Sequence, residues 1–143
     1  MIVKETTNIE DIKSILCDPA IYDTITEDGS SSLESFEPEL DGNSFIGGYV
    51  GGEIVALMVY HEFLDGNKCH IQVLPSFRKK YAREFGEKAL LFRGTKPLYA
   101  TIPDLYKNVI DFSLSFGFEV IRKTKGTYLK NKISYDDNIL RLK

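Results

Sequence analysis

The chain has 143 residues, of which 43% are hydrophobic and 27% are charged, and its formal net charge is −3. These values are typical of globular proteins, so they argue against a disordered chain and a small disulfide scaffold, and they provide no overall attraction to nucleic acid. The two cysteines form no metal-binding pattern, and no apolar run approaches the roughly 18 residues of a membrane span. We therefore expect one soluble, cytoplasmic domain over residues 1–143, with no metal.

Residues 1–4 predict a short first strand. Residues 7–10, Thr-Asn-Ile-Glu, have the pattern of a capping box ahead of apolar residues at helical spacing, which predicts a first helix that ends near Pro19. Residues 24–43 contain six carboxylates and neither lysine nor arginine, interleaved with glycine, serine and proline. This composition predicts an acidic loop, with one helical turn around residues 32–36.

The middle of the chain predicts an antiparallel meander. Two β-rich runs, residues 45–50 and 53–63, are separated by Gly51-Gly52, a two-residue hairpin signal. Asp65-Gly66 then predicts a turn into a third strand, residues 68–74. Beyond Pro75 the apolar residues recur at helical spacing through about residue 92, which predicts a central helix.

The last third predicts one more strand–helix unit and closing strands. Residues 97–101 form a strand pattern, and apolar residues from Leu105 to Phe116 at helical spacing are followed by Gly117 as a helix stop. We expect the chain to return as a strand at 118–124, to turn at Lys125-Gly126, and to continue through 127–130. A final strand is predicted at 138–142.

The junction between the third strand and the central helix is strongly basic. Arg78, Lys79 and Lys80 are predicted to open the helix, where the macrodipole is already positive and disfavours cations by about 0.3–1 kcal/mol per charge. A phosphate-bearing ligand would offset that cost and would also bind the free backbone N–H groups. The alternative is that these side chains extend into water, where their repulsion is screened.

This segment resembles the acetyl-CoA-binding motif of the GNAT N-acetyltransferase superfamily. Val73-Leu74-Pro75 is similar to the V-x-P strand end, and Arg78 matches the first position of the (Arg/Gln)-x-x-Gly-x-(Gly/Ala) loop that holds the CoA pyrophosphate. Tyr81 and Arg83 stand where the family has glycines, so the resemblance implies that basic side chains contact the phosphates directly. The implied cofactor-binding residues here are Val73, Leu74, Arg78, Lys79, Lys80, Tyr81, Ala82 and Arg83.

A second segment, residues 108–118, is similar to the GNAT pattern Asn-x-x-Ala-x-x-Phe-Tyr-x-x-x-Gly-Phe. Asn108, Phe112, Gly117 and Phe118 fall at matching places. Asn108 and Phe112 are therefore further cofactor-binding candidates, although core packing is the simpler role for the phenylalanines. Ser113 occupies the position of the family's frequent general-acid tyrosine, which makes it a catalytic candidate.

The order of elements also resembles the GNAT fold and covers nearly the whole chain. The resemblance implies an α/β (α+β) fold, a mixed, mostly antiparallel twisted sheet of six to seven strands with three to four helices. It further implies transfer of an acetyl group from acetyl-CoA to an amine on a small molecule or peptide. Compact, divergent GNAT-like proteins of this kind are familiar from bacteriophages.

Direct attack by an amine requires a base that removes the ammonium proton. His70, on the strand before the basic junction, is the first candidate, and His61 and Glu62 on the neighbouring strand follow. A carboxylate-rich rim at 24–43 would attract a cationic acceptor, unless those residues form only a solvated loop.

Two other functions are weighed against the enzyme. The GNAT fold could serve as a CoA-binding or structural module without catalysis. Nucleic-acid binding through the basic cluster is the least favoured alternative because the net charge is negative and the aromatic residues have the spacing of a buried helix face. Formation of a homodimer is left open.

Overall fold

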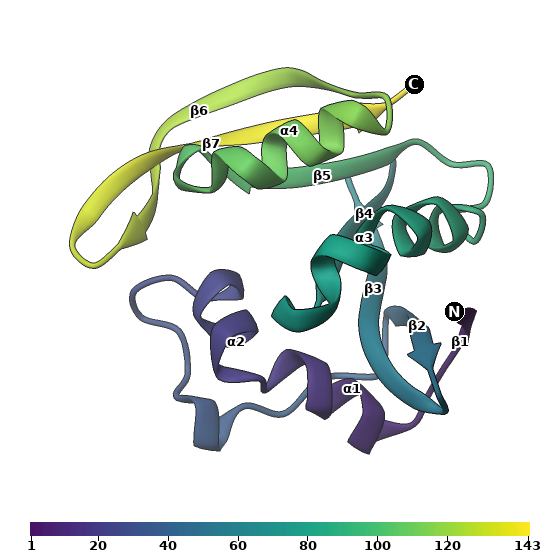
Figure 1. Ribbon diagram of the computed structural model, residues 1–143. Coiled ribbons are helices and arrows are strands. Elements are labelled where there is room, and N and C mark those ends of the chain that lie inside the picture. Colours follow the sequence, from purple (N-terminus) through teal and green to yellow (C-terminus); the bar gives the residue numbers. More distant parts are fainter.

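The computed structural model describes residues 1–143 as a seven-stranded sheet flanked by four α-helices (Figure 1). The strand order is β1-β2-β3-β4-β5-β7-β6, and every neighbouring pair is antiparallel except β4 and β5. The expected fold class is thereby confirmed. The strands are β1 (Ile2–Glu5), β2 (Asn43–Val50), β3 (Glu53–Phe63), β4 (Gly66–Val73), β5 (Leu98–Pro103), β6 (Phe118–Lys130) and β7 (Ile133–Leu142). The helices are α1 (Ile9–Leu16), α2 (Pro19–Ile25), α3 (Pro75–Leu90) and α4 (Lys107–Ser115).

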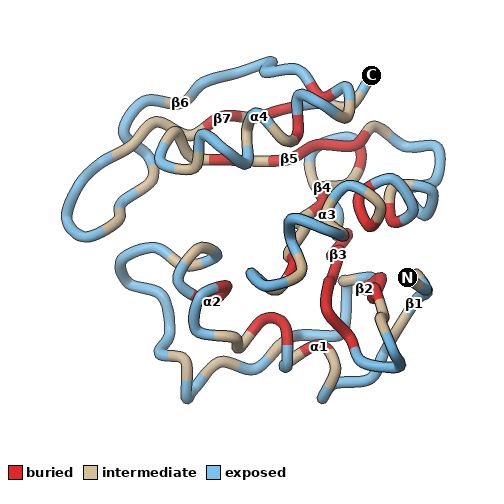
Figure 2. Tube along the Cα trace, in the orientation of Figure 1, coloured by how far each residue is buried: buried red, intermediate tan, exposed pale blue.

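The predicted meander of β2, β3 and β4 forms the centre of the sheet. Strand β3 is buried continuously from Ile54 to Tyr60, because helices cover both of its faces (Figure 2). Helices α1 and α2 pack on the face that contains Leu57 and Val59. Helix α3 packs on the opposite face, where Phe85 is fully buried. None of the four helices has the length and apolar character needed to cross a membrane.

The N-terminal region differs from the prediction in two details. Asn8, not Thr7, is the N-cap of α1 and accepts a hydrogen bond from the Asp11 backbone, so the cap lies one residue after the first residue of the predicted box. Helix α1 ends at Leu16, near Pro19 as predicted, but Pro19 itself begins a second helix, α2, because Asp18 caps this helix and a proline at the first helical position loses no hydrogen bond. The helical turn expected in the acidic loop is present at Leu33–Ser35.

The central helix α3 begins at Pro75, three residues earlier than the predicted basic start at Arg78. Proline at the first position and Leu74 as N-cap fix this start, which places Lys79 and Lys80 beyond the first turn. The backbone amides of residues 79–83 therefore lie in the interior of a helix. They cannot form a loop around a pyrophosphate, because helical N–H groups bond to the preceding turn.

The C-terminal hairpin also differs from the prediction. Lys125-Gly126 is not a turn between strands but part of a bulge within one long strand, β6, where the register shifts between Thr124 and Tyr128. The turn lies at Asn131 and Lys132, whose φ angles are 50° and 65°. Both residues adopt the left-handed conformation that a two-residue hairpin turn requires, without the glycine that usually signals it.

Strands β4 and β5 separate soon after they meet. Only Asn67 and Lys68 of β4 pair with β5, opposite Leu98 and Tyr99. Beyond Lys68, strand β4 has no neighbour on its β5 side, so the sheet opens toward the start of α3. Gly66 fixes the meeting point, because a Cβ there would lie 2.0 Å from the carbonyl oxygen of Pro97.

Replacing Gly66 with alanine should destabilise the protein by about 3 kcal/mol, because the added methyl group collides with backbone that cannot move away without breaking the β4–β5 pair. Gly94→Ala is the control, since Gly94 has open space around it and only a positive φ of 72°. That variant should lose about 1 kcal/mol. Urea denaturation of both variants measures the difference, and equal losses would contradict the assigned role of Gly66.

Candidate active site

A cleft of about 920 Å³ lies where β4 and β5 separate. It is lined from both faces of the sheet. Residues on the side of α3 and α4 include Val73, Arg78, Ala82, Asn108, Phe112 and Ser113. Residues on the side of α2 and the β6–β7 hairpin include Glu27, Lys68, His70, Thr101, Tyr128 and Asp137. The cleft therefore joins half of the predicted cofactor-binding residues with a second, largely polar wall.

Helix α3 faces the cleft with Arg78, Ala82 and Gly86, which follow one another at intervals of four residues. A Cβ at Gly86 would lie 2.5 Å from the ring of Phe116, so the glycine allows this ring to pack directly against the backbone of α3. The Arg78 Nε atom donates to the Val73 carbonyl at 2.9 Å and ties the start of α3 to the end of β4. The two terminal nitrogens of Arg78 form no hydrogen bond within the protein.

The other basic residues of the junction are placed differently. Lys79 and Lys80 are exposed and do not line the cleft, and Tyr81 is half-buried beside Phe77. Arg83 stacks over Phe116 at 4.2 Å and donates to the Ser115 hydroxyl at 2.7 Å, besides pairing with Glu87. Arg83 thus joins α3 to the end of α4. Leu74, the N-cap of α3, packs between the two hydrophobic clusters.

Helix α4 contributes Asn108, Phe112 and Ser113 to the cleft. Phe112 packs edge-on against Phe116, with ring centroids 4.9 Å apart. Ser113 is 9% exposed, and its hydroxyl group has no hydrogen-bond partner in the protein. Since the residue lines the cleft, this hydroxyl is available to a bound molecule.

His70 and His61 form a stacked pair on the α2 side of the sheet, with their Nε2 atoms 2.9 Å apart. The His61 Nδ1 atom contacts the Glu62 carbonyl oxygen at 3.0 Å, and a carbonyl can only accept, so Nδ1 carries the proton. With the proton on Nδ1, the His61 Nε2 atom presents its lone pair and accepts a hydrogen bond from the N–H group of His70 Nε2. By elimination, the lone pair of neutral His70 is on Nδ1, which makes no hydrogen bond within the protein.

Burial lowers the pKa of His70 to about 4, and this pKa is lowered further by the nearby positive charge of Lys68 and by His61 when that ring is protonated on both nitrogens. His70 is therefore neutral at physiological pH. The structure places the third candidate, Glu62, elsewhere: it is exposed and lines a separate hollow of about 260 Å³ beside Tyr60 and Arg93. Glu62 and His70 do not share a site.

The sequence analysis missed four residues of the polar wall: Lys68, Thr101, Tyr128 and Asp137. The Lys68 ammonium group crosses the separation between β4 and β5 and donates to the Thr101 hydroxyl at 3.2 Å. Asp137 lies on β7 opposite Pro103, on the same face of the sheet as Thr101. The alternation of side chains along a strand predicts which face of the sheet each residue occupies. Only the order of the strands across the sheet shows that these residues lie in the same cleft.

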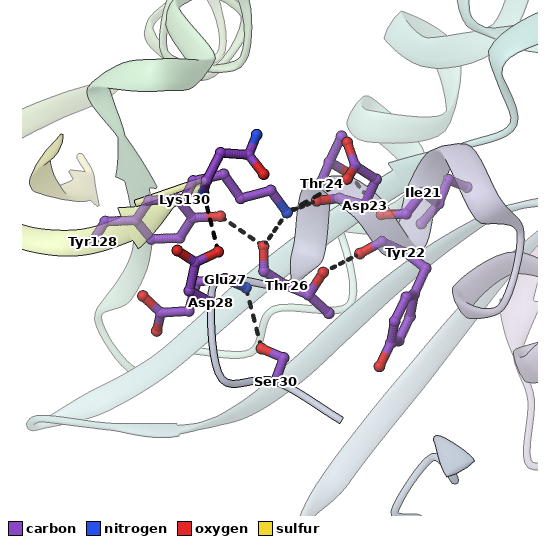
Figure 3. Close-up of polar contacts among 11 residues, drawn as sticks. Ile21, Tyr22, Asp23, Thr24, Thr26, Glu27, Asp28, Ser30, Tyr128 and Lys130 are labelled. Atoms are coloured by element: carbon purple, nitrogen blue, oxygen red, sulfur yellow. Dashed lines mark hydrogen bonds and ion pairs between the residues drawn. The ribbon is translucent and has the colours of Figure 1, made fainter. Parts of the chain in front are cut away.

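The loop after α2 is fastened to the β6–β7 hairpin (Figure 3). The Lys130 ammonium group donates to the carbonyl oxygens of Asp23 and Thr26, and the Tyr128 hydroxyl also donates to Thr26. The Asp28 carboxylate accepts from the backbone N–H groups of Asn131 and Lys132, the two left-handed residues of the turn. We call these contacts the latch.

Solved structures of N-acetyltransferases share this architecture, although no family model and no curated protein matches the sequence. A mutant of Vibrio cholerae spermidine N-acetyltransferase has a TM-score of 0.79 and 11% identity, over 99% of this chain and 94% of its own. A Staphylococcus aureus N-acetyltransferase has a TM-score of 0.74 and 14% identity, over 99% and 96%. The ribosomal-protein-alanine N-acetyltransferase of Brucella melitensis has a TM-score of 0.68 and 18% identity, over 99% and 98%.

The protein has the GNAT fold. The resemblance found in the two sequence motifs is thus confirmed at the level of the fold, even though Tyr81 and Arg83 replace the motif glycines. Within this GNAT fold, the cleft at the β4–β5 separation is the candidate active site.

Replacing Asp28 with alanine should weaken the latch, because the N–H groups of Asn131 and Lys132 lose their acceptor. We expect a loss of about 1 kcal/mol in urea denaturation, since the bonds are exposed to water. Amide hydrogen exchange at these two residues should accelerate. Asp41→Ala is the matched control, because Asp41 is exposed and its carboxylate makes no contact. Unchanged exchange in the Asp28 variant would contradict the latch.

His70 should make the protein less stable in acid. Its pKa is about 4 in the folded protein and about 6.5 when unfolded, so between these values the unfolded chain binds more protons. The free energy of unfolding should therefore fall as the pH drops from about 6.5 to 4, by about 3 kcal/mol from this group alone. His70→Gln should flatten this decline in denaturation curves. An identical decline in both proteins would refute the assignment.

Proposed function

We propose that the protein transfers an acetyl group from acetyl-CoA to a primary amine by direct attack of the amine on the thioester. The cleft at the β4–β5 separation supports this proposal most strongly, because it is open to a ligand on both faces of the sheet. A donor held on the α3 side and an acceptor held on the α2 side would meet inside it. The likeness to N-acetyltransferase structures supports the same reaction.

The residues of the α3 side fit acetyl-CoA. Beyond Lys68, strand β4 has no partner toward β5, so its backbone N–H and C=O groups can pair with the amides of a pantetheine chain as an added strand would. The first turn of α3 and the free nitrogens of Arg78 provide donors for the pyrophosphate, with Lys79 and Lys80 nearby. Asn108 and Phe112 would line the opposite wall. Acetyl-CoA would supply the activated acetyl group.

On the α2 side, His70 would act as the base. Its Nδ1 lone pair can take a proton from the acceptor ammonium, while the Nε2 proton moves toward His61. The freed amine attacks the carbonyl carbon, a C–N bond forms, the C–S bond breaks, and the second proton that the attacking nitrogen loses goes to the leaving CoA thiolate. The Ser113 hydroxyl, on the α3 side, would donate a hydrogen bond to the leaving sulfur. Glu62 has no role in this scheme.

A second candidate is a GNAT-fold module that binds CoA without catalysis. The observation that favours it is the start of α3 at Pro75, which removes the phosphate-binding loop of the family motif. Binding would then depend on side-chain charge more than on backbone amides, and it would be more sensitive to salt.

Calorimetry with acetyl-CoA, followed by thiol release with a panel of amines, separates these functions. We expect binding that weakens at least about tenfold, or about 1.4 kcal/mol, when Arg78 and Lys80 are both replaced by glutamate. Lys125→Glu is the control, because Lys125 is exposed on the distant bulge of β6.

His70→Gln should bind acetyl-CoA normally and lower kcat about a hundredfold. Binding without thiol release from any amine would support the non-catalytic module. The absence of binding by the folded protein would exclude both candidates.

A further inference from the structure

The α2 side of the cleft contains a lysine that lacks a carboxylate partner. The Lys68 side chain is half-buried, with its ammonium group 3.2 Å from the Thr101 hydroxyl and 4.3 Å from the centre of the Phe63 ring. Lys68 takes part in none of the seven ion pairs of the protein. Burial lowers the pKa of this ammonium, because water that would solvate the charge is excluded.

The same side of the cleft contains a carboxylate that lacks a cationic partner. Asp137 is half-buried and accepts one hydrogen bond, from the Asn138 backbone at 3.1 Å. It also takes part in no ion pair. Burial raises its pKa, and the charges of Glu27 and Asp104 raise it further, whereas Lys68 lowers it. The charges of Lys68 and Asp137 therefore affect each other's pKa, but the two side chains form no ion pair.

The fold holds Lys68 and Asp137 apart on opposite edges of the opening. Lys68 is the last residue of β4 that pairs with β5, and Asp137 is on β7, one strand further along the sheet. Both line the cleft, together with His70, which is two residues from Lys68 on the same strand face. An unpaired cation, an unpaired carboxylate and a free imidazole nitrogen thus share one wall.

We propose that the acceptor is a small zwitterionic amine, such as a free amino acid, held by its carboxylate at Lys68 and Thr101 and by its ammonium at Asp137. This inference rests on the proposed function and adds the class of substrate. A zwitterion satisfies both half-buried charges at once and leaves the net charge of the site unchanged. It also brings the ammonium toward His70 Nδ1.

The acidic loop does not favour a polycationic acceptor instead. Asp28 is bound by the turn of the hairpin, and Glu37 pairs with Lys13. The other carboxylates of the loop that do not line the cleft are Glu34, Glu39 and Asp41. Glu27 lines the cleft, and one of its oxygens accepts from the Leu129 backbone. The Lys68 ammonium would repel a polyamine that entered beside it.

The test compares free amino acids with the corresponding primary amides and with spermidine, in the presence of acetyl-CoA. Acid and amide differ only in the anionic carboxylate, and the amide is the easier ammonium to deprotonate, so intrinsic reactivity favours the amide. We expect kcat/KM to be at least about tenfold higher for the best amino acid than for its amide. Equal values, or a preference for spermidine, would overturn the inference.

Two variants at Lys68 test whether this residue causes the preference for the acid over the amide. Lys68→Met keeps the apolar stem beside Phe63 and should lower kcat/KM at least about tenfold more for the acid than for the amide. Lys68→Arg should restore most of the preference, and Lys125→Met should leave it intact. Equal losses for acid and amide in Lys68→Met would show that Lys68 is only structural.

A binding measurement distinguishes failure of the inference from failure of the proposed function. If no amine is acetylated, the proposed chemistry is wrong, and thermal shift with millimolar free amino acids then tests the site alone. Stabilisation of the wild type by an amino acid but not by its amide, lost in Lys68→Met, would support the zwitterion site. No shift with any amino acid would overturn it.

Discussion

The brief pairing of β4 with β5 is the constraint on which the rest of the structure depends. Two residues of each strand meet, and the carbonyl of Pro97 approaches Gly66 too closely for any side chain. Beyond this point the strands separate, so a continuous sheet acquires an opening with unsatisfied backbone along one edge. Unpaired N–H and C=O groups are costly when they are dry, which favours their exposure to water or to a ligand with matching groups.

The two faces of the sheet turn this opening into two different chemical environments. On the α3 side, close approach at Gly86 and stacking of Arg83 over Phe116 produce an apolar, tightly packed wall with Arg78 at its end. On the α2 side, the wall contains Lys68 and Asp137, which form no ion pair, and His70, whose Nδ1 atom makes no hydrogen bond within the protein. A ligand that spans the opening would therefore make mainly apolar contacts on the α3 side and mainly polar and charged contacts on the α2 side.

Local patterns predicted most of the elements, and their failures have identifiable causes. Strand β3 is a continuous run of residues that favour strands, and helix α4 has apolar residues at helical spacing. Helix α2, by contrast, has only seven residues and a proline that marks a beginning as readily as an end. The hairpin turn was missed because Asn131 and Lys132 adopt a glycine-like conformation, while Gly126 suggested a turn that is a bulge. At the turn, the Asp28 carboxylate accepts hydrogen bonds from both N–H groups and supports a conformation that the local sequence does not indicate.

The candidate site also contains residues that the sequence predicted and residues that it did not. The residues near α3 were found because they are close in sequence and follow a motif. Lys68, Thr101 and Asp137 belong to three strands whose order across the sheet is not evident from their order in the chain. Their significance depends on the absence of ion-pair partners, which is a property of the folded molecule. His70 was predicted from its residue type, but its free nitrogen follows from its contact with His61.

The latch also bears on how the protein folds. Its contacts join residues that are 102 to 107 positions apart, so each one closes a loop of most of the chain. Contacts between residues so far apart in the sequence cost much chain entropy when they form early in folding. The segments that make them are exposed and have few apolar neighbours. The α2 side of the cleft is therefore completed late, after the sheet has formed. It can also open in a local fluctuation that leaves the α3 side folded.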